Sequence, residues 1–240
     1  MISVCMATYN GEKYIEEQVK SIMMQLGEED ELVVSDDSST DDTIKILESF
    51  NDKRIKIFNN EKENNKEHPF RSVTKNYENA LKNTKGDYIF LSDQDDVWLP
   101  NKVKTMLPFL QKDCLVISDS WLVNDNLEKL YKSSKFKPYK KGFFNNFGRT
   151  KNLGCSFAFT KRVRDYALPF PKELISHDIW IRVLAELKFD IAYIAEPLFY
   201  YRRHSSNLSD VQKSKNTIFI IIKYRAVIFY ECLKRYYFRK

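Results

Sequence analysis

Short β-branched runs alternate with amphipathic segments through the first half of the chain. The runs predict four strands, at Ile2–Thr8, Glu31–Ser35, Ile55–Asn59 and Tyr88–Leu91. Apolar residues at helical spacing predict a helix after each of the first three strands: one that carries Ile15, Val19 and Ile22, one over about Asp41–Phe50 and one over about Ser72–Asn83. This order predicts an α/β fold with a mostly parallel central sheet flanked by helices. In such sheets ligands bind at the edge formed by the carboxyl ends of the strands.

The second half of the chain is less regular. Residues 120–150 are rich in Lys, Asn and Phe, and we interpret them as an irregular insertion suited to acceptor contacts. Beyond it the pattern predicts a helix that opens near Ser176–Asp178 and three strands, at Gly154–Thr160, Ile191–Ile194 and Leu198–Tyr201.

The C-terminal segment, residues 211–240, predicts a basic amphipathic helical tail. Its apolar positions form one stripe with Lys223, Arg225 and Lys234 beside it; the stripe consists of Phe219, Ile222, Ala226, Phe229, Tyr230, Leu233 and Tyr237. Such a stripe favours contact with an anionic membrane surface, and the alternative is packing on the domain or on a partner subunit. No apolar run reaches the ~18 residues of a membrane-spanning helix.

Charge and cysteines narrow the class of protein. Residues 211–240 hold eight Lys or Arg and a single acid, Glu231, so residues 1–210 are nearly neutral although the chain carries +6. The body of the protein therefore lacks a nucleic-acid footprint. Four cysteines without a CxxC pair indicate reduced thiols in a cytosolic protein, and Met1–Tyr9 does not resemble a secretion signal.

Acidic residues gather directly after two predicted strands. Asp36 and Asp37 follow the second, and Asp93, Asp95 and Asp96 follow the fourth. The first pair suits an Asx-type turn that caps the next helix. The second cluster is too crowded and too near the core for a solvated surface, and a divalent cation with oxygen ligands would neutralise it. A cation held by few protein ligands favours a site shared with a diphosphate.

Common phosphate-binding loops are absent from the sequence. The first strand is followed by ATYNGEKY without a GxGxxG pattern, and no Gly-Lys-Ser/Thr occurs. This pattern excludes dinucleotide-dependent dehydrogenases and P-loop nucleotide hydrolases. An α/β domain with metal-binding acids and neither loop favours nucleotide-sugar chemistry.

Five motifs, in order from Ser3 to Asn207, resemble the family 2 inverting glycosyltransferases of the GT-A fold, in the bacterial rhamnosyltransferase-like branch. The matching strings are VCMATYNG, VVSDDSSTDDT, GDYIFLSDQDDVWLPNKV, HDIW and YYRRH. The resemblance implies a glycosyltransferase domain over residues 1–210, with a nucleotide-sugar-binding half (1–110) and an acceptor and catalytic half (111–210), followed by the tail.

The resemblance implies roles for the residues of the nucleotide half. Thr8, Tyr9 and Asn10 would hold the base and ribose. Asp36 would accept a hydrogen bond from the imide nitrogen of uracil or thymine. Asp93 and Asp95 match the Asp-x-Asp motif: Asp95 is the expected metal ligand, Asp93 binds either the metal or the ribose, and Asp96 either shares the metal or caps the turn.

The resemblance also implies roles in the second half. Asp178 matches the catalytic base at the start of a helix, where the alternative is a simple N-cap. Arg202 and Arg203 match a diphosphate-binding region, where a surface cluster is the alternative, and His204 matches a third metal ligand. The segment Gly154–Ser156 would face the donor sugar and the acceptor.

The implied reaction is a metal-dependent, inverting transfer of rhamnose or another hexose from a UDP- or dTDP-sugar, with Mn²⁺ or Mg²⁺ as cofactor. The implied acceptor is a saccharide, expected to be lipid-linked as in cell-surface polysaccharide synthesis. The implied location is cytoplasmic, peripheral on the inner face of the cell membrane. The sequence is compatible with a homodimer and does not decide the oligomeric state. Two alternatives remain: a sugar nucleotidyltransferase and a non-catalytic nucleotide-sugar-binding subunit.

Overall fold

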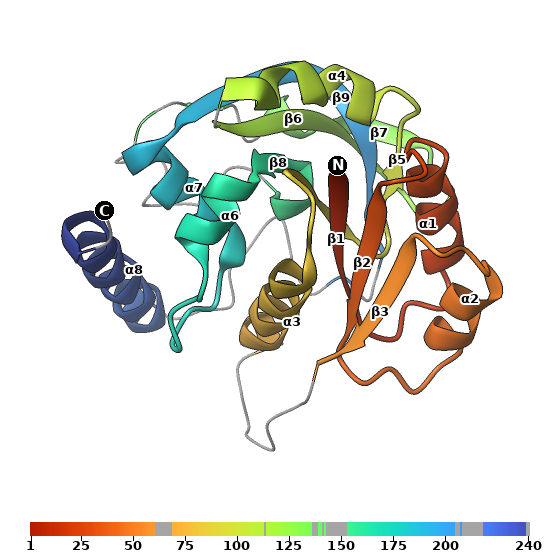
Figure 1. The fold of residues 1–240 in the computed structure, drawn as a ribbon, viewed down its shortest axis with the longest axis horizontal. Helices are drawn as coiled ribbons and strands as arrows, with labels where there is room; N and C mark the ends of the chain where they lie inside the picture. Colours follow the sequence, from red (N-terminus) through yellow and green to blue (C-terminus); the bar gives the residue numbers. More distant parts are fainter. Residues whose placement is uncertain are drawn as a thin grey trace.

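The computed structural model describes residues 1–60, 69–112, 114–135, 139–140, 142, 153–204, 207 and 218–238. Its centre is one curved mixed sheet whose described strands run in the order β3-β2-β1-β4-β8-β6-β9-β5, with β7 paired to β6 (Figure 1). Helices cover both faces of this sheet, as the α/β pattern predicts.

The first half of the chain forms the parallel part of the sheet, as predicted. β1 pairs in parallel with β2 and β4, and β2 pairs in parallel with β3. The elements are β1 (Ile2–Thr8), α1 (Ile15–Met23), β2 (Glu31–Asp36), α2 (Thr43–Ser49), β3 (Ile55–Asn59), α3 (Pro69–Asn83) and β4 (Tyr88–Asp93). Because β2 and β4 run further than predicted, Asp36 and Asp93 are the last residues of strands and do not follow them.

The second half adds strands of both directions. β8 is antiparallel to β4 and β6, whereas β6 and β9 are parallel. The elements are β5 (Val97–Trp98), α4 (Lys102–Met106), a 3-10 helix (Leu107–Lys112), β6 (Cys114–Val123), β7 (Lys129–Lys132), η2 (Ser133–Lys135), η3 (Gly154–Ser156), β8 (Phe157–Thr160), α6 (Lys161–Ala167), α7 (His177–Lys188), β9 (Asp190–Arg202) and α8 (Ile218–Phe238).

Three predictions for the second half were wrong in detail. The predicted strand Gly154–Thr160 begins as the 3-10 turn η3 and becomes a strand only at Phe157. The two strands predicted at 191–194 and 198–201 are one strand, β9, whose register against β6 shifts next to Pro197. Proline lacks a backbone N–H, so it fits such an irregularity. The predicted insertion 120–150 contains the end of β6 and all of β7, and its part 143–150 lies outside the described residues.

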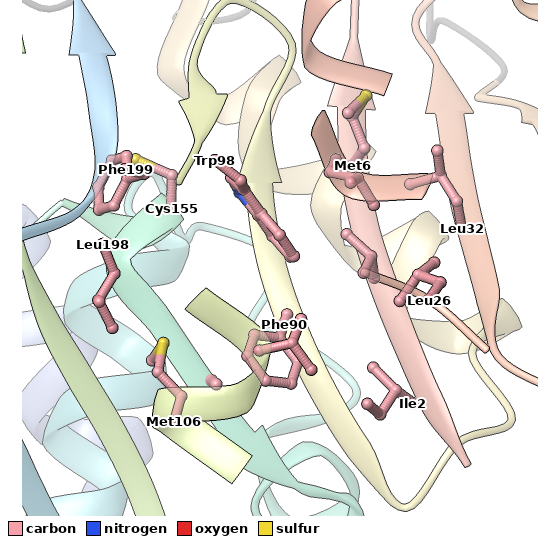
Figure 2. Packing of buried hydrophobic residues seen from close by; sticks show 14 of the residues in the cluster. Ile2, Met6, Leu26, Leu32, Phe90, Trp98, Met106, Cys155, Leu198 and Phe199 are labelled. Carbon is pink, nitrogen blue, oxygen red and sulfur yellow. The ribbon is translucent and has the colours of Figure 1, made fainter. Parts of the chain in front are cut away.

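Side chains alternate between two cores along the strands. Val4 and Met6 of β1 pack with α1, α2 and α4 on one face, and Cys5 packs with α3, α6 and α7 on the other. Figure 2 shows Met6 in the first of these cores, with Phe90 and Met106. All four cysteines are buried and free. This two-sided burial explains why β1, β2 and β4 read as nearly continuous apolar runs.

α8 packs on the outside of α7, at one end of the molecule (Figure 1). Ile228 and Cys232 are buried, and Arg235 donates to the carbonyl of Leu168 at 3.0 Å while its guanidinium lies 5.0 Å from the Trp180 ring centroid. The helix therefore docks through a face that the sequence did not single out.

The predicted apolar stripe of α8 lies on the opposite, exposed face. Its described members are exposed: Ile222, Ala226, Phe229, Tyr230, Leu233 and Tyr237. The alternative that the stripe packs on the domain is wrong for these residues. Lys223 and Lys234 are exposed beside the stripe, whereas Arg225 is half-buried on the docking side. Among the described helices, none combines the length and apolar character needed to span a bilayer.

Candidate active site

Strand topology brings the predicted site residues to one edge of the sheet. Thr8 at the end of β1 is level with Asp36 of β2, and Asp93 of β4 is level with Ala7. β6 and β9 run in the same direction as these strands, so the end of β9, followed by Arg203 and His204, lies at the same edge. Because β8 is antiparallel, the turn η3 at its beginning also lies there. We refer to this edge as the acidic edge.

Gln94 holds the loop that follows β1. Its Oε1 accepts hydrogen bonds from Thr8 Oγ1 at 2.5 Å and from the backbone N–H of Tyr9 at 2.8 Å, and its Nε2 donates to the Tyr9 carbonyl at 3.1 Å. The side chain of Tyr9 is left 47% exposed. The β1 loop is thus tied to the Asp93–Asp96 segment, with one aromatic ring available at the surface.

A second set of bonds joins the β1 loop to the segment after β2. Asn10 has a φ of 47° and accepts a hydrogen bond from the Thr40 N–H at 2.9 Å. Asp36 is buried and accepts hydrogen bonds from the N–H and hydroxyl of Ser39, at 2.8 and 2.5 Å. The turn predicted for this segment is therefore present, and it joins Asp36, which pairs with Thr8 in the strand register, to Ser39, whose Oγ accepts the Asn10 N–H. The prediction that this acidic pair caps the next helix was wrong, because the N-cap of α2 is Asp42.

Asp93, the last residue of β4, lies between Tyr77 of α3 and the start of α7. Tyr77 of α3 donates a hydrogen bond to Asp93 Oδ1 at 2.5 Å, and the ring of His177 stacks on Tyr77 at 4.0 Å. Burial, together with repulsion from Asp95 and to a smaller extent from Asp178, raises the pKa of Asp93 to about 6. Asp178 is therefore close enough to the Asp93 carboxylate to affect it electrostatically.

Asp96, Asp93 and Cys155 form a compact buried group. One ligand atom from each lies within 4.8 Å of the others, and Asp96 Oδ2 has no hydrogen-bond partner among the described residues. Burial and the neighbouring carboxylates raise the pKa of Asp96 well above its usual value. An orphaned, buried carboxylate oxygen among hard donors is a suitable place for a cation, whereas the Cys155 thiol, whose pKa burial raises, is a poor ligand.

Asp95 and His204 lie together, as the resemblance implies for two metal ligands. Asp95 Oδ2 is 2.8 Å from His204 Nε2 and accepts a hydrogen bond from Asn207 Nδ2 at 3.1 Å. The ring of Tyr14 packs on His204 at 4.6 Å. A carboxylate and an imidazole held side by side form a donor set that suits Mn²⁺ or Mg²⁺.

Arg202 points inward and Arg203 is half-buried. The Arg202 guanidinium donates to the carbonyls of Asp95 at 3.0 Å and Asp125 at 2.6 Å, and it pairs with Glu17. It therefore clamps the acidic edge to α1. Arg203 lies 5.9 Å from the Tyr201 ring centroid.

Asp178 lies in the first turn of α7. The N-cap is Ser176, so the prediction that Asp178 itself could be the cap was wrong. Asp178 Oδ1 accepts hydrogen bonds from Ser176 Oγ at 2.6 Å and from the Ile179 N–H at 2.8 Å. A Cβ on Gly154 would lie 2.7 Å from His177 Nε2 and 3.4 Å from Asp178 Cβ, so η3 packs directly against the start of α7.

The turn η3 therefore contacts both predicted parts of the site, the acidic group after β4 and the expected base on α7. Gly154 contacts the His177–Asp178 pair, and Cys155 contacts Asp93 and Asp96. An open groove of about 1360 Å³ between α3, residues 169–174 and α8 contains none of the predicted site residues. The sequence interpretation did not assign Gln94, Tyr77 or Lys102; only the position of Gln94 inside the acidic motif could have indicated a role at this edge.

Comparisons with known proteins give the family of this chain. The family model for glycosyl transferase family 2 matches residues 3–167. The chain is 32% identical over 220 residues to dTDP-rhamnosyl transferase RfbG of Shigella flexneri, which covers 84% of this chain and 72% of the relative. It is 26% identical over 214 residues to the UDP-Glc:alpha-D-GlcNAc-diphosphoundecaprenol beta-1,3-glucosyltransferase WfgD of Escherichia coli, covering 87% and 79%.

A solved structure shares the fold. The crystal structure of S. aureus TarS 1–349 in complex with UDP superposes with a TM-score of 0.65 at 25% identity over 84% of this chain. The chain spans 60% of the length of that structure. With a family model that covers most of the chain and a 32% identical relative, this protein belongs to glycosyltransferase family 2 and has the GT-A fold.

Proposed function

We propose that this protein is an inverting glycosyltransferase that moves rhamnose or another hexose from a UDP- or dTDP-sugar to a saccharide acceptor in bacterial cell-surface polysaccharide synthesis. The observation that carries the proposal is the turn η3, which contacts the Asp93–Asp96 group on one side and Asp178 on the other. A donor diphosphate and an acceptor hydroxyl would meet at this turn.

The nucleotide would bind on the framework that joins the ends of β1 and β2. Thr8, Tyr9 and Asn10 would line one side of the nucleotide site, and the exposed Tyr9 ring would contact the base. Asp36 would accept the imide N–H of uracil or thymine, a proton that cytosine lacks at this position. Arg203 would contact the diphosphate. Arg202, whose guanidinium is hydrogen-bonded to two backbone carbonyls, would hold the acidic edge in place.

Asp95 and His204 would hold the divalent cation, with Asp93 or Asp96 as a further ligand. When bound, Mn²⁺ or Mg²⁺ would offset the charge that grows on the leaving diphosphate. The fit rests on the paired oxygen and imidazole donors and on the orphaned Asp96 Oδ2.

Asp178 would act as the general base. Its Oδ1 is occupied by Ser176 and Ile179, while among the described residues Oδ2 has no hydrogen-bond partner and can accept a proton. Asp178 would remove the proton from the acceptor hydroxyl while that oxygen attacks the anomeric carbon, and the bond to the diphosphate would break on the opposite side, with inversion.

The substitution Asp178→Asn tests the assignment of the base. Asn keeps the Oδ1 acceptor for Ser176, so the helix start should fold normally, but the amide cannot take a proton. We expect the turnover of sugar transfer to fall ~100- to 10,000-fold with unchanged UDP affinity, measured by nucleoside diphosphate release and by calorimetry. Asp190→Asn, an exposed carboxylate at the start of β9, is the control. Normal turnover of Asp178→Asn would refute the assignment.

The acceptor in this proposal is lipid-linked, which is consistent with the name of the E. coli relative. The exposed stripe of α8, flanked by Lys223 and Lys234, supports a peripheral position on the anionic inner face of the cell membrane. Sugar nucleotidyltransfer, the main alternative reaction, would produce pyrophosphate, which the same release assay distinguishes.

A further inference from the structure

Lys102 is a fully buried lysine on α4, and the functions assigned so far do not use it. Its Nζ donates a hydrogen bond to the Cys155 carbonyl at 2.9 Å. The ammonium lies 4.3 Å from the Trp98 ring centroid and 4.2 Å from that of Phe199; Figure 2 shows both rings with Cys155 in the same core cluster. Burying an ammonium is costly. An apolar side chain of the same length would fill this place without that cost, so the charge itself needs an explanation.

The charge of Lys102 acts on Asp93, Asp96 and Cys155, the compact group at the acidic edge. Burial lowers the pKa of Lys102 to about 8, and the attraction of Cys155, Asp96 and Asp93 opposes this shift. In turn, the Lys102 ammonium favours the charged form of Asp96, whereas burial and the neighbouring carboxylates disfavour it. Lys102 is thus a buried cation beside the most crowded carboxylates of the described site, in addition to Arg202.

The hydrogen bond of Lys102 ends on the turn that links the two halves of the site. Cys155 gives its carbonyl to Lys102 and places its thiol within 4.8 Å of carboxylate oxygens of Asp93 and Asp96. The preceding residue, Gly154, packs on His177 and Asp178 so closely that an added Cβ would collide with His177 Nε2. A shift of Cys155 would therefore move the surface on which Asp178 rests.

We propose that Lys102 is a positioning residue: by holding the Cys155 carbonyl beside Asp96, it fixes the turn η3 and thereby the place of Asp178 relative to the acidic edge. This inference rests on the proposed role of Asp178 as the base. Geometric errors of about 1 Å in a catalytic arrangement can cost roughly 100-fold in rate, so the effect should be visible in turnover.

The test compares Lys102→Met with Lys104→Met, an exposed lysine of the same helix. Met has a similar length but neither the charge nor the donor. We expect Lys102→Met to lower kcat by at least about 10-fold while the KM for the donor, the UDP affinity and the Mn²⁺ affinity in the presence of UDP each stay within about threefold. Its unfolding temperature should fall, because the substitution leaves the Asp96 carboxylate and the Cys155 carbonyl without their buried partner, so kcat is measured well below that temperature. Lys104→Met should behave as wild type.

A double substitution separates positioning from general damage. If Lys102 acts through Asp178, Lys102→Met should lower kcat by less than about twofold further in the Asp178→Asn background. A wild-type kcat in Lys102→Met, a loss confined to KM or UDP affinity, or full additivity with Asp178→Asn would overturn the inference. Any of these results would leave the proposed function intact, whereas normal turnover of Asp178→Asn would contradict the assignment of Asp178 as the base.

Gly154→Ala approaches the same turn from its other side and decides the question if Lys102→Met does not fold. Its Cβ would displace the turn from His177 and Asp178. A drop in kcat at unchanged UDP affinity supports the positioning role of the turn, and an unchanged kcat overturns it.

Discussion

The three aspartates of one four-residue motif have three different surroundings. Asp95 contacts His204 and Asn207, and Asp93 accepts a hydrogen bond from the hydroxyl of Tyr77. Asp96 is buried, and one of its oxygens has no partner in the part of the chain that the structure describes. The same chemical group therefore has three different sets of partners within one short motif. This arrangement suits an edge that must hold a cation with oxygen ligands.

The raised pKa of Asp93 predicts a stability effect with a defined sign. Burial raises this pKa from 3.8 to about 6, so the folded protein binds more protons than the unfolded chain between these values, and stability falls as pH rises through that window. Without metal, Asp93→Asn should therefore stabilise the protein at pH 7.5 by about 1–3 kcal/mol, because the amide can still accept the Tyr77 hydroxyl.

Urea unfolding in the presence of EDTA at pH 7.5 and pH 4 measures this difference. The gain should be present at pH 7.5 and should largely disappear at pH 4, where Asp93 is protonated in the folded protein. Asp190→Asn, which is exposed, should show no such pH dependence. A gain of equal size at both pH values would show that the carboxylate charge is not its cause.

At the scale of elements, the parallel strands depend on close backbone contacts. A Cβ on Gly86 would lie 2.7 Å from the backbone nitrogen of Ser3 and 2.9 Å from the carbonyl carbon of Ile2. Gly86→Ala should therefore push β1 away from the start of β4 and destabilise the fold by about 1–3 kcal/mol, measured as a lower urea midpoint.

Gly27→Ala is the matched control for this prediction. Its Cβ would meet a flexible carboxylate oxygen of Asp30 at 3.4 Å, which is ordinary contact. The control should change the unfolding free energy by less than about 0.5 kcal/mol. Equal effects of the two substitutions would contradict the close approach of Gly86 to β1.

The elements of the first half could be predicted from sequence because each has a clear period and a clear end. The sequence interpretation did not include β6, although Cys114–Val123 lies in the middle of the sheet. β6 is buried on both faces, and a short apolar run without alternation does not distinguish a strand from a buried helix. Glu196 and Pro197 interrupt the apolar pattern of β9, so one strand was predicted as two.

The candidate site could be predicted only where a motif carried it. Asp95 and His204 were predicted from two separate motifs, and the atoms Asp95 Oδ2 and His204 Nε2 lie 2.8 Å apart. Gln94, Tyr77 and Lys102 act through partners 16 to 86 residues away along the chain, and no local pattern contains such contacts. Their contribution becomes visible only in the folded arrangement.

At the scale of the whole molecule, α8 gives the protein one face of distinct character. Phe229, Leu233 and Tyr237 are exposed on it, with Lys223 and Lys234 beside them. Replacing these three apolar residues together by Ser should lower co-sedimentation with phosphatidylglycerol vesicles by at least about 10-fold, because apolar insertion is lost. Turnover on a water-soluble acceptor analogue should stay the same.

Two exposed apolar residues elsewhere provide the control for this surface. Phe109 and Leu130 are 47% and 53% exposed and lie outside α8. The pair Phe109→Ser and Leu130→Ser should leave vesicle binding unchanged. Unchanged binding of the α8 variant would contradict membrane contact through this helix and leave a protein partner as the occupant of the stripe.

The central claim is that the acidic edge holds a cation against the donor diphosphate within reach of Asp178. Crystals grown with UDP and Mn²⁺, measured at the manganese absorption edge, test it most directly. We expect a single anomalous peak between the diphosphate and the Asp95 carboxylate, on the side of the sheet edge that Asp178 faces. Bound UDP with its diphosphate away from Asp93–Asp96, or a manganese peak at another surface, would contradict the account.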